Sequence, residues 1–141
     1  MIQISAYLTF NGNCREAMSF YRECLGGDLS FRTAGEAEGG AVLPEPFRSA
    51  VVQATLVSGA LVLTGSDMVG EEGLIKGNAV SLLLHCHGEK ETRDCYRKLA
   101  AGGVASHPLR DTIAGGLFGV LTDKYGHHWL LSCNDIYPKN I

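Results

Sequence analysis

Residues 4–27 read ISAYLTFNGNCREAMSFYRECLGG, and this stretch decides the fold. Ile4–Phe10 is an apolar, β-prone run that ends at Asn11-Gly12, which predicts a strand followed by a turn. A helix is then expected from Asn13 to a glycine pair, with Glu16 placed as in a capping box. Apolar side chains recur at helical spacing along this segment, so the helix is predicted to bury one face.

Three further strands are predicted in the first half of the chain, at Leu29–Thr33, Ala50–Val57 and Ala60–Thr64. Ser58-Gly59 joins the last two strands as a hairpin. The segment 34–46 is rich in Gly, Glu and Pro, a composition that is typical of a mobile loop.

The second half repeats this order of elements. Ala79–Cys86 predicts a strand and Glu89–Ala101 predicts a helix. The remaining strands are expected at Val104–Ser106, Leu117–Thr122 and His128–Cys133.

The two helix ends share residues as well as position. Tyr21-Arg22 before Gly26-Gly27 is echoed by Tyr96-Arg97 before Gly102-Gly103. Because strand, helix and three strands follow in the same order on both sides, the repeat predicts an α+β fold of two βαβββ modules.

The modules are expected to form a single domain over residues 1–141. Module one covers about residues 1–67 and module two about 79–135. A half of roughly 60 residues would bury its sheet poorly alone, so we expect the two modules to pack together.

The composition is that of a folded globular protein, with 45% hydrophobic and 19% charged residues. The net charge of -3 provides no basic field, so nucleic acid is not an expected partner. No apolar run reaches membrane-spanning length, and Met1–Ser5 lacks the pattern of a signal peptide. Five cysteines without CxxC spacing indicate reduced thiols, and we therefore expect a cytoplasmic protein with no membrane partner.

Two groups of residues resemble the signatures of a known family. The first group is Tyr7–Ala17, Phe20-Tyr21 and Gly26-Gly27, and the second is Pro108–Thr112, Phe118-Gly119, Thr122-Asp123, Tyr125-Gly126 and Trp129. Together they resemble the PhnB-like proteins, a branch of the vicinal-oxygen-chelate (glyoxalase/bleomycin-resistance/dioxygenase) superfamily. The resemblance covers most of the chain apart from a shortened 34–46 loop.

The resemblance implies that the modules form a cupped mixed sheet with a central cleft, and that the protein is a homodimer. This branch often carries a methyltransferase-like description. The sequence does not support that activity, because it has no glycine-rich loop with a ribose-binding acid for a methyl donor.

Metal-dependent members of the superfamily place a His, Gln or Glu on the first and last strand of each module. By resemblance these positions fall on Ala6, Ser81 and Leu130, and near Val62. Alanine, leucine and valine have no donor atom, and a neutral serine hydroxyl is a poor lone ligand. We therefore expect no metal ion and no other cofactor.

The five histidines are the remaining candidates for metal ligands. Strand parity puts His85 and His128 on one face of the second sheet, the cleft face away from the helix. The resemblance implies that Ser81 lies beside Leu130, which would separate His85 from His128 by roughly 20 Å, too far to share one ion. His85 and His87 could hold a metal at the strand end, but only as an incomplete site.

Polar residues near strand ends are further candidates. Asp67 and Asp111-Thr112 could face the cleft, and Asp111 could act as a base or orient a ligand; the alternative is turn chemistry. Arg110 replaces a more usual glutamine, and Ile113-Ala114 replace an aromatic pair, so we expect a more open and more cationic pocket. Cys14 lies where a helix dipole could lower its thiol pKa, but close packing of a small, semi-buried residue is the favoured explanation.

We predict that the protein binds a small organic molecule in an apolar cleft without a metal. The predicted cleft residues are Leu8, Phe10, Asp67, Leu83, His85, Arg110, Asp111, Thr112, Phe118, His128 and Leu130. One alternative is an isomerase- or lyase-type enzyme that moves a proton with His85 or Asp111 as its base. Another is a drug-sequestering resistance protein, which needs an acidic cleft that Arg110 argues against.

Overall fold

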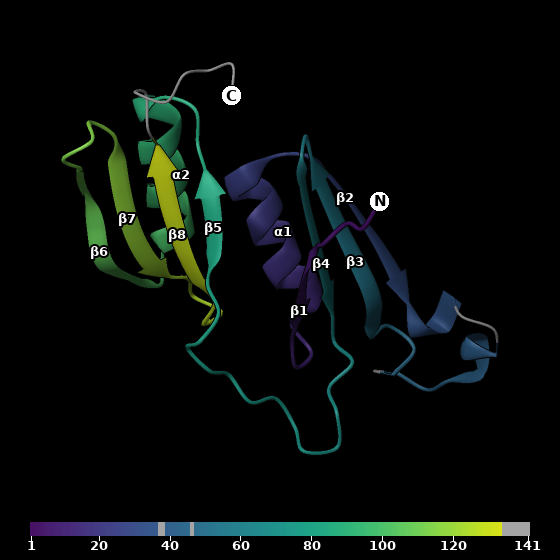
Figure 1. The fold of residues 1–141 in the computed structure, drawn as a ribbon. Helices are drawn as coiled ribbons and strands as arrows, with labels where there is room; N and C mark the ends of the chain where they lie inside the picture. The colour runs from purple at the N-terminus through teal and green to yellow at the C-terminus, as the bar shows by residue number, and fades with distance from the viewer. Residues whose placement is uncertain (37–38, 46, 134–141) are drawn as a thin grey trace. The chain divides into compact units, whose positions relative to one another are not determined.

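The computed structural model describes residues 1–36, 39–45 and 47–133 (Figure 1). The chain divides into two compact units, Met1–Ile75 and Lys76–Ile141. Each contains one α-helix and one four-stranded mixed sheet, so the predicted α+β class is confirmed. Across the described residues, neither helix is long and apolar enough to cross a membrane.

The first unit follows the order strand, helix and three strands. Its elements are β1 (Ala6–Thr9), α1 (Cys14–Leu25), β2 (Asp28–Thr33), β3 (Val51–Ser58) and β4 (Leu61–Ser66), with short 3-10 turns at Ala34–Glu36 and Gly40–Val42. The sheet order is β1-β4-β3-β2, in which β1 and β4 run parallel and the other pairs run antiparallel.

The second unit repeats this topology. Its elements are β5 (Leu82–His85), α2 (Glu89–Ala100), β6 (Val104–Asp111), β7 (Leu117–Thr122) and β8 (His128–Cys133). The sheet order is β5-β8-β7-β6, and only β5 and β8 run parallel. The repeat of two βαβββ modules is therefore confirmed in its order, pairing and strand direction.

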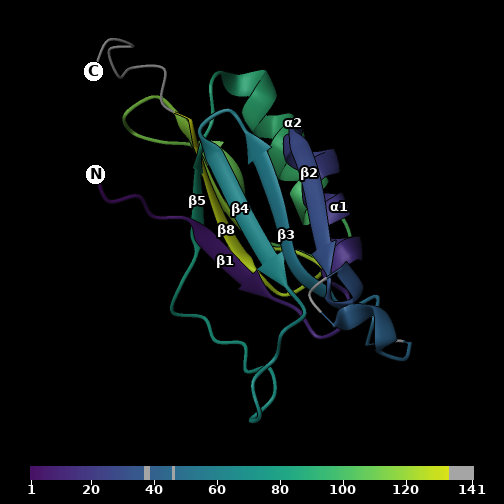
Figure 2. The same cartoon turned by 90° about the vertical axis from the view of Figure 1, so that its right-hand side faces the viewer.

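Helix α1 covers one face of the first sheet (Figure 2). Its buried residues Ala17, Met18 and Tyr21 recur at the helical spacing that the sequence predicts. They face buried sheet residues such as Leu56 and Leu63. Burying this apolar stripe is what holds the helix in place, since packing supplies most of a helix's stability in a protein.

Helix α2 packs in the same way on β6, β7 and β8. Thr92, Cys95, Tyr96 and Leu99 form its buried side. The Tyr96 hydroxyl donates a hydrogen bond to the Val120 carbonyl oxygen at 2.8 Å and also lies 3.1 Å from the His107 carbonyl oxygen. This contact anchors the helix to two strands at once.

Strand β6 is longer than the sequence predicts. It runs to Asp111 rather than ending at Ser106, and its register against β7 shifts twice, between Val104 and His107 and between His107 and Arg110. These irregularities break the alternation of apolar and polar residues, so the period of two that marks a strand is lost.

Candidate functional site

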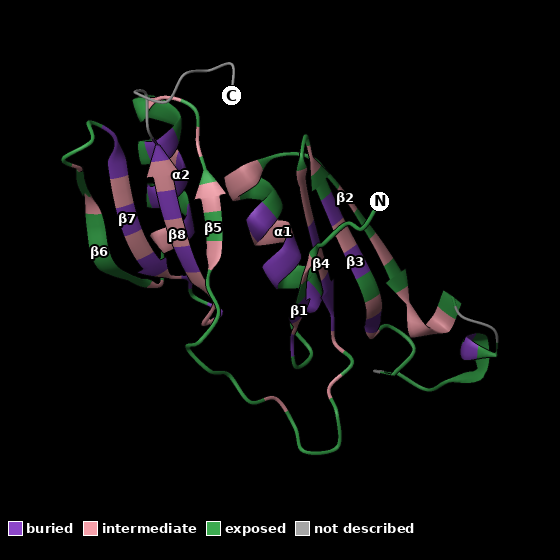
Figure 3. Ribbon diagram, in the orientation of Figure 1, coloured by how far each residue is buried: buried purple, intermediate pink, exposed green. Residues whose placement is uncertain are grey.

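One face of the second sheet is not covered by α2. Along β7 and β8, buried residues alternate with half-buried ones (Figure 3). The buried set faces the helix, because the Gly119 backbone lies against the Tyr96 ring. We call the other side the open face; its residues are Leu83, His85, Val104, His107, Arg110, Phe118, Val120, Thr122, His128, Leu130 and Ser132. The strand parity predicted for β5 and β8 is confirmed.

The register between β5 and β8 corrects one expectation. Leu83, not Ser81, lies beside Leu130, and His85 lies beside Ser132. His85 and His128 are therefore four residues apart along the strand direction, which is about 13 Å rather than roughly 20 Å. The two histidines remain too far apart to share one ion, but they lie closer together on the open face than the sequence suggests.

His128 is held in place through both ring nitrogens. Nδ1 lies 2.9 Å from the Thr122 hydroxyl, and Nε2 lies 3.3 Å from the Gly77 carbonyl oxygen. Because a carbonyl oxygen only accepts, Nε2 is the donor to Gly77, and the tautomer with its proton on Nε2 also lets Nδ1 accept from Thr122. The His128 ring is therefore a half-buried part of the open face whose orientation is fixed by these two contacts.

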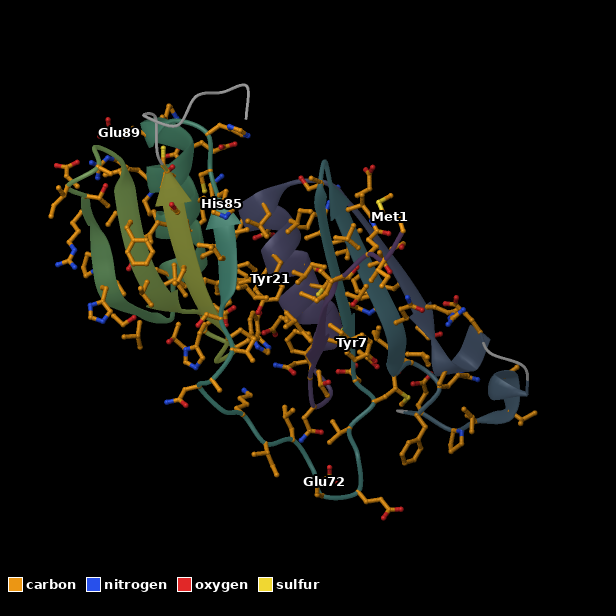
Figure 4. All side chains as sticks on the ribbon, in the orientation of Figure 1. Met1, Tyr7, Tyr21, Glu72, His85 and Glu89 are labelled. Carbon is orange, nitrogen blue, oxygen red and sulfur yellow. The ribbon has the colours of Figure 1, made fainter. Side chains whose placement is uncertain are left out.

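His85, by contrast, is exposed at the C-terminal end of β5 (Figure 4). His87 is also exposed, and its backbone N–H donates to the Glu91 carboxylate at 2.6 Å. Within the described ranges, no group of three or more His, Cys, Asp and Glu side chains is arranged to hold a metal ion.

The residues at the family's metal positions do not fit a catalytic divalent ion. Ala6 lies beside Leu63 and faces α1, so the matching position on the other side of the first sheet is Tyr7, beside Thr64. A neutral phenol and a hydroxyl are poor ligands, and the Thr64 hydroxyl already donates to the Ala6 carbonyl oxygen at 2.7 Å. Leu130 offers no donor atom in the second unit.

Leu8 and Phe10 do not line an open face, and that expectation is wrong. Both are buried against α1, and the Phe10 and Tyr21 ring centroids are 6.5 Å apart. Leu8 lies beside Gly65, whose missing side chain leaves room for Phe10 and the helix. Tyr7, which is 59% exposed, occupies the other face. The signal was present in the sequence, since Leu8 and Phe10 are the more apolar alternating pair.

Asp67 holds the first unit together rather than projecting freely. Its Oδ1 accepts hydrogen bonds from the backbone N–H groups of Gly12 and Cys14, at 3.0 and 2.9 Å. Its Oδ2 accepts from the Val51 N–H at 3.3 Å. The predicted capping box is not formed, because the Asn13 side chain makes no capping hydrogen bond. A carboxylate from beyond β4 caps α1 instead.

The loop candidates separate onto two faces. Arg110 lies opposite Phe118 on the open face, whereas Asp111 lies opposite Leu117 on the helix side. Both residues are exposed. Thr112 stabilises the following turn, since its hydroxyl accepts from the Gly116 N–H at 3.0 Å. Turn chemistry is therefore carried by Thr112, and Arg110 is the charged residue that joins the open face.

Cys14 is a packed thiol rather than an activated one. Burial, and next the nearby Asp67 carboxylate, raise the pKa of the Cys14 thiol to about 12. These effects outweigh any lowering by the helix N-terminus, so the alternative of close packing is supported.

A buried carboxylate fixes the turn between β7 and β8. Asp123 accepts from the backbone N–H groups of Tyr125 and His127, at 2.8 and 3.1 Å, and from the Trp129 indole N–H at 2.7 Å. Burial lowers the pKa of the neighbouring His127 imidazole. This network explains in structural terms why Thr122-Asp123, Tyr125-Gly126 and Trp129 occur together.

The sequence missed His107 as a member of the open face. It lies beside Val120, in the same row as Leu130 and Leu83. Its strand was predicted to end one residue earlier, and the two register shifts in β6 hide the period that would have placed it.

The comparisons with known proteins agree on one family. A family model described as 3-demethylubiquinone-9 3-methyltransferase matches residues 2–132. Protein YjdN of Escherichia coli (strain K12) is 26% identical over 145 residues, which cover 92% of this chain and 93% of YjdN.

Solved structures extend this similarity. Protein PA1353 from Pseudomonas aeruginosa is 33% identical, with 95% of this chain and 98% of that chain covered and a TM-score of 0.78. The PhnB protein from Bacillus cereus, described as a putative 3-demethylubiquinone-9 3-methyltransferase, is 27% identical, with 94% and 99% covered and a TM-score of 0.70. A glyoxalase/bleomycin resistance protein/dioxygenase family enzyme from Burkholderia phytofirmans PsJN is 11% identical over 91% and 96% of the two chains, with a TM-score of 0.61, and shares the fold.

Proposed function

This chain belongs to the PhnB-like (3-demethylubiquinone-9 3-methyltransferase-like) family, and from that membership we propose that its open face binds a small organic molecule without a metal ion. The observation that carries the proposal is the grouping of Leu83, Phe118 and Leu130 with Arg110 on one side of one sheet. Small-molecule sites combine an apolar lining with a few polar groups that orient the ligand.

The charges on this face support a ligand that carries an acid group. Arg110 supplies a permanent positive charge, and His85 and His107 supply further donors. Within the described strands of the second sheet, the open face includes no Asp or Glu. A guanidinium binds a carboxylate through two parallel hydrogen bonds, so the proposed ligand is an apolar molecule with a carboxylate or a similar anionic group.

The proposal does not extend to methyl transfer. A methyl donor of the nucleoside type needs a glycine-rich loop at a strand–helix junction together with an acid that binds its ribose. In this chain α1 and α2 are instead entered through Asn13 and Gly88, neither of which belongs to such a loop.

Thermal-shift titration tests the binding proposal. A panel of apolar carboxylic acids is compared with the matching neutral amides, with and without a metal chelator. A bound acid at about 100 times its Kd should stabilise the protein by about 2.7 kcal/mol, equally in the presence of chelator. The neutral partner should bind more weakly, because it cannot pair with Arg110.

Two exposed arginines give the matched variants. Arg110→Gln should remove the preference for the acid over its amide, whereas Arg97→Gln, on α2, should keep it. An acid preference that survives Arg110→Gln would place the ligand elsewhere, and stabilisation that disappears with chelator would contradict metal-free binding.

A second candidate function is proton transfer with a side-chain base. His85 supports it, because it is exposed on the open face beside Ser132, whereas Asp111 lies opposite a helix-facing residue. If the protein is an enzyme of this kind, His85→Gln should abolish turnover of the identified ligand while its binding survives. Turnover that persists in this variant would leave only the binding function.

The proposed setting is a cytoplasmic homodimer. Family membership supports the dimer, and the thiol state of all five cysteines supports a reducing compartment. Sedimentation at micromolar concentration should give twice the chain mass of 15.1 kDa. A strictly monomeric species under those conditions would contradict the dimer.

A further inference from the structure

Three cysteines of the second unit gather on the helix-facing side of its sheet. The backbone N–H of Cys86 donates to the Ser132 carbonyl oxygen at 2.8 Å, which continues the parallel register of β5 and β8 by one residue. Cys86 therefore lies beside Cys133, and Cys95 approaches from the buried side of α2. The proposed ligand site uses none of these thiols, because it is on the opposite face.

The Cys86 thiol is in hydrogen-bonding contact with the Cys95 thiol and with the Thr92 hydroxyl. Thr92 and Cys95 are three residues apart on α2, so they lie on the same side of the helix. The Thr92 hydroxyl also lies 2.7 Å from the Gly88 carbonyl oxygen, which fixes it at the helix start. This arrangement sets Cys86 against the helix surface.

The two thiols differ in how far solvent can reach them. Cys86 is half-buried at the end of β5, whereas Cys95 is only 8% exposed. The hydrogen bond from Cys95 lowers the pKa of the Cys86 thiol against the opposing effects of burial and the Glu91 carboxylate. A small oxidant therefore meets Cys86 first, and Cys86 is the better nucleophile because the thiolate is the reactive form.

We propose that Cys86 and Cys95 form a redox-active pair in which Cys86 reacts with a peroxide and Cys95 then closes a disulfide. In the first step the Cys86 sulfur attacks the peroxide, forming an S–O bond as the O–O bond breaks, and the leaving oxygen departs as water after protonation. In the second step the Cys95 sulfur attacks the Cys86 sulfenic acid, forming the S–S bond and releasing a second water. Overall, two thiols lose two hydrogens and one hydrogen peroxide is reduced to two waters.

The placement of the other cysteines makes the proposal specific. Cys14 and Cys24 lie on α1 of the first unit, and burial holds the Cys14 thiol in its protonated form. Cys133 is 3% exposed and lies beside Cys86 across the strand pair. A link from Cys86 to Cys133 is thus the nearest competing product, and it is an outcome of the test.

Hydrogen peroxide treatment of the full native chain tests the pair. We expect intact mass to fall by two hydrogens, free thiols to fall from five to three, and peptide mapping to find Cys86 joined to Cys95. A dithiol reductant should restore all five thiols. A Cys86–Cys133 link, a link between two chains, stable sulfinic acid on Cys86, or no reaction before unfolding would each overturn the proposal.

Variants assign the two roles separately. In Cys95→Ser, Cys86 should stop at the sulfenic acid and become labelled by dimedone; in Cys86→Ser, Cys95 should stay reduced. Cys24→Ser is the matched control and should still lose two thiols. The wild-type measurement decides the matter even if a core variant fails to fold.

Discussion

At the scale of single residues, Asp67 links parts of the chain that are far apart in sequence. One carboxylate accepts hydrogen bonds from Gly12 and Cys14 at the start of α1 and from Val51 at the start of β3. A helix N-terminus leaves backbone N–H groups without partners, and here a residue more than fifty positions away satisfies them. The strand ends and the helix start are thereby fixed relative to one another.

Replacing Asp67 by asparagine should destabilise the protein by about 1–3 kcal/mol, because one acceptor oxygen becomes an amide that faces a backbone donor. Urea unfolding of Asp67→Asn measures this loss. Asp28→Asn, an exposed aspartate on β2 of the same unit, is the matched control and should unfold like the wild type. Equal midpoints for the two variants would show that the three hydrogen bonds contribute little.

The Cys14 thiol should make stability depend on alkaline pH. Its pKa is about 12 in the folded chain against an ordinary 9.0, so folding keeps a proton that the unfolded chain releases. The stabilisation is complete below the unfolded value and is lost as pH rises through the folded one. Burial also raises the pKa of the Tyr96 hydroxyl, which adds to the same loss.

Thermal unfolding between about pH 8 and about pH 11 checks this dependence. Tm should fall over this range in the wild type and in Cys24→Ala, and it should fall less steeply in Cys14→Ala. Parallel curves for the three proteins would mean that Cys14 does not carry the effect.

At the scale of elements, the glycine pairs that follow the two helices do more than end them. A Cβ at Gly27 would overlap the Val57 carbonyl oxygen, and a Cβ at Gly103 would overlap the Thr122 carbonyl oxygen. The preceding glycines, Gly26 and Gly102, adopt positive φ but have more room. The second glycine of each pair therefore allows the helix end to approach the backbone of a neighbouring strand.

Alanine substitutions should separate these two roles. Gly27→Ala and Gly103→Ala should cost about 3 kcal/mol or more, because backbone must move to admit the new methyl group. Gly26→Ala and Gly102→Ala should cost about 1 kcal/mol, the strain of a positive φ. Denaturant unfolding of all four proteins measures the difference, and equal costs within each pair would refute the close-approach role.

The elements were largely predictable, whereas their register was not. Periods of 3.6 and two are local properties, so both helices and the parity of β5 and β8 follow from the sequence. Strand β1 has only 4 residues, so its alternation is brief, and Leu8 and Phe10 were assigned to the wrong face although they are the more apolar alternating pair. Leu83 on β5 and Leu130 on β8 lie side by side although the two strands are far apart in the sequence. No local pattern encodes this register.

At the scale of the whole molecule, the two units are joined by a segment that is hydrogen-bonded to the first unit at its start, through Asp67, and to the second unit at Lys76 and Gly77. Residues 67–81 contain no helix or strand. Within this segment the Lys76 ammonium donates to the Tyr125 carbonyl oxygen at 2.8 Å, and the Gly77 carbonyl oxygen contacts His128 at 3.3 Å. The boundary between the units falls immediately before this anchor, at Ile75.

Limited proteolysis should therefore distinguish two neighbouring sites. A glutamate-specific protease should cut after Glu71 or Glu72 in the native protein at nearly the rate seen in urea, since both are exposed. Trypsin should cut after Lys76 at least about tenfold more slowly than in urea, because the anchor must first open. His128→Ala should speed cleavage at Lys76 alone, whereas His107→Ala should not. If His128→Ala leaves the Lys76 rate unchanged, the hydrogen bond to Gly77 does not hold the second half of the segment on the β7–β8 turn.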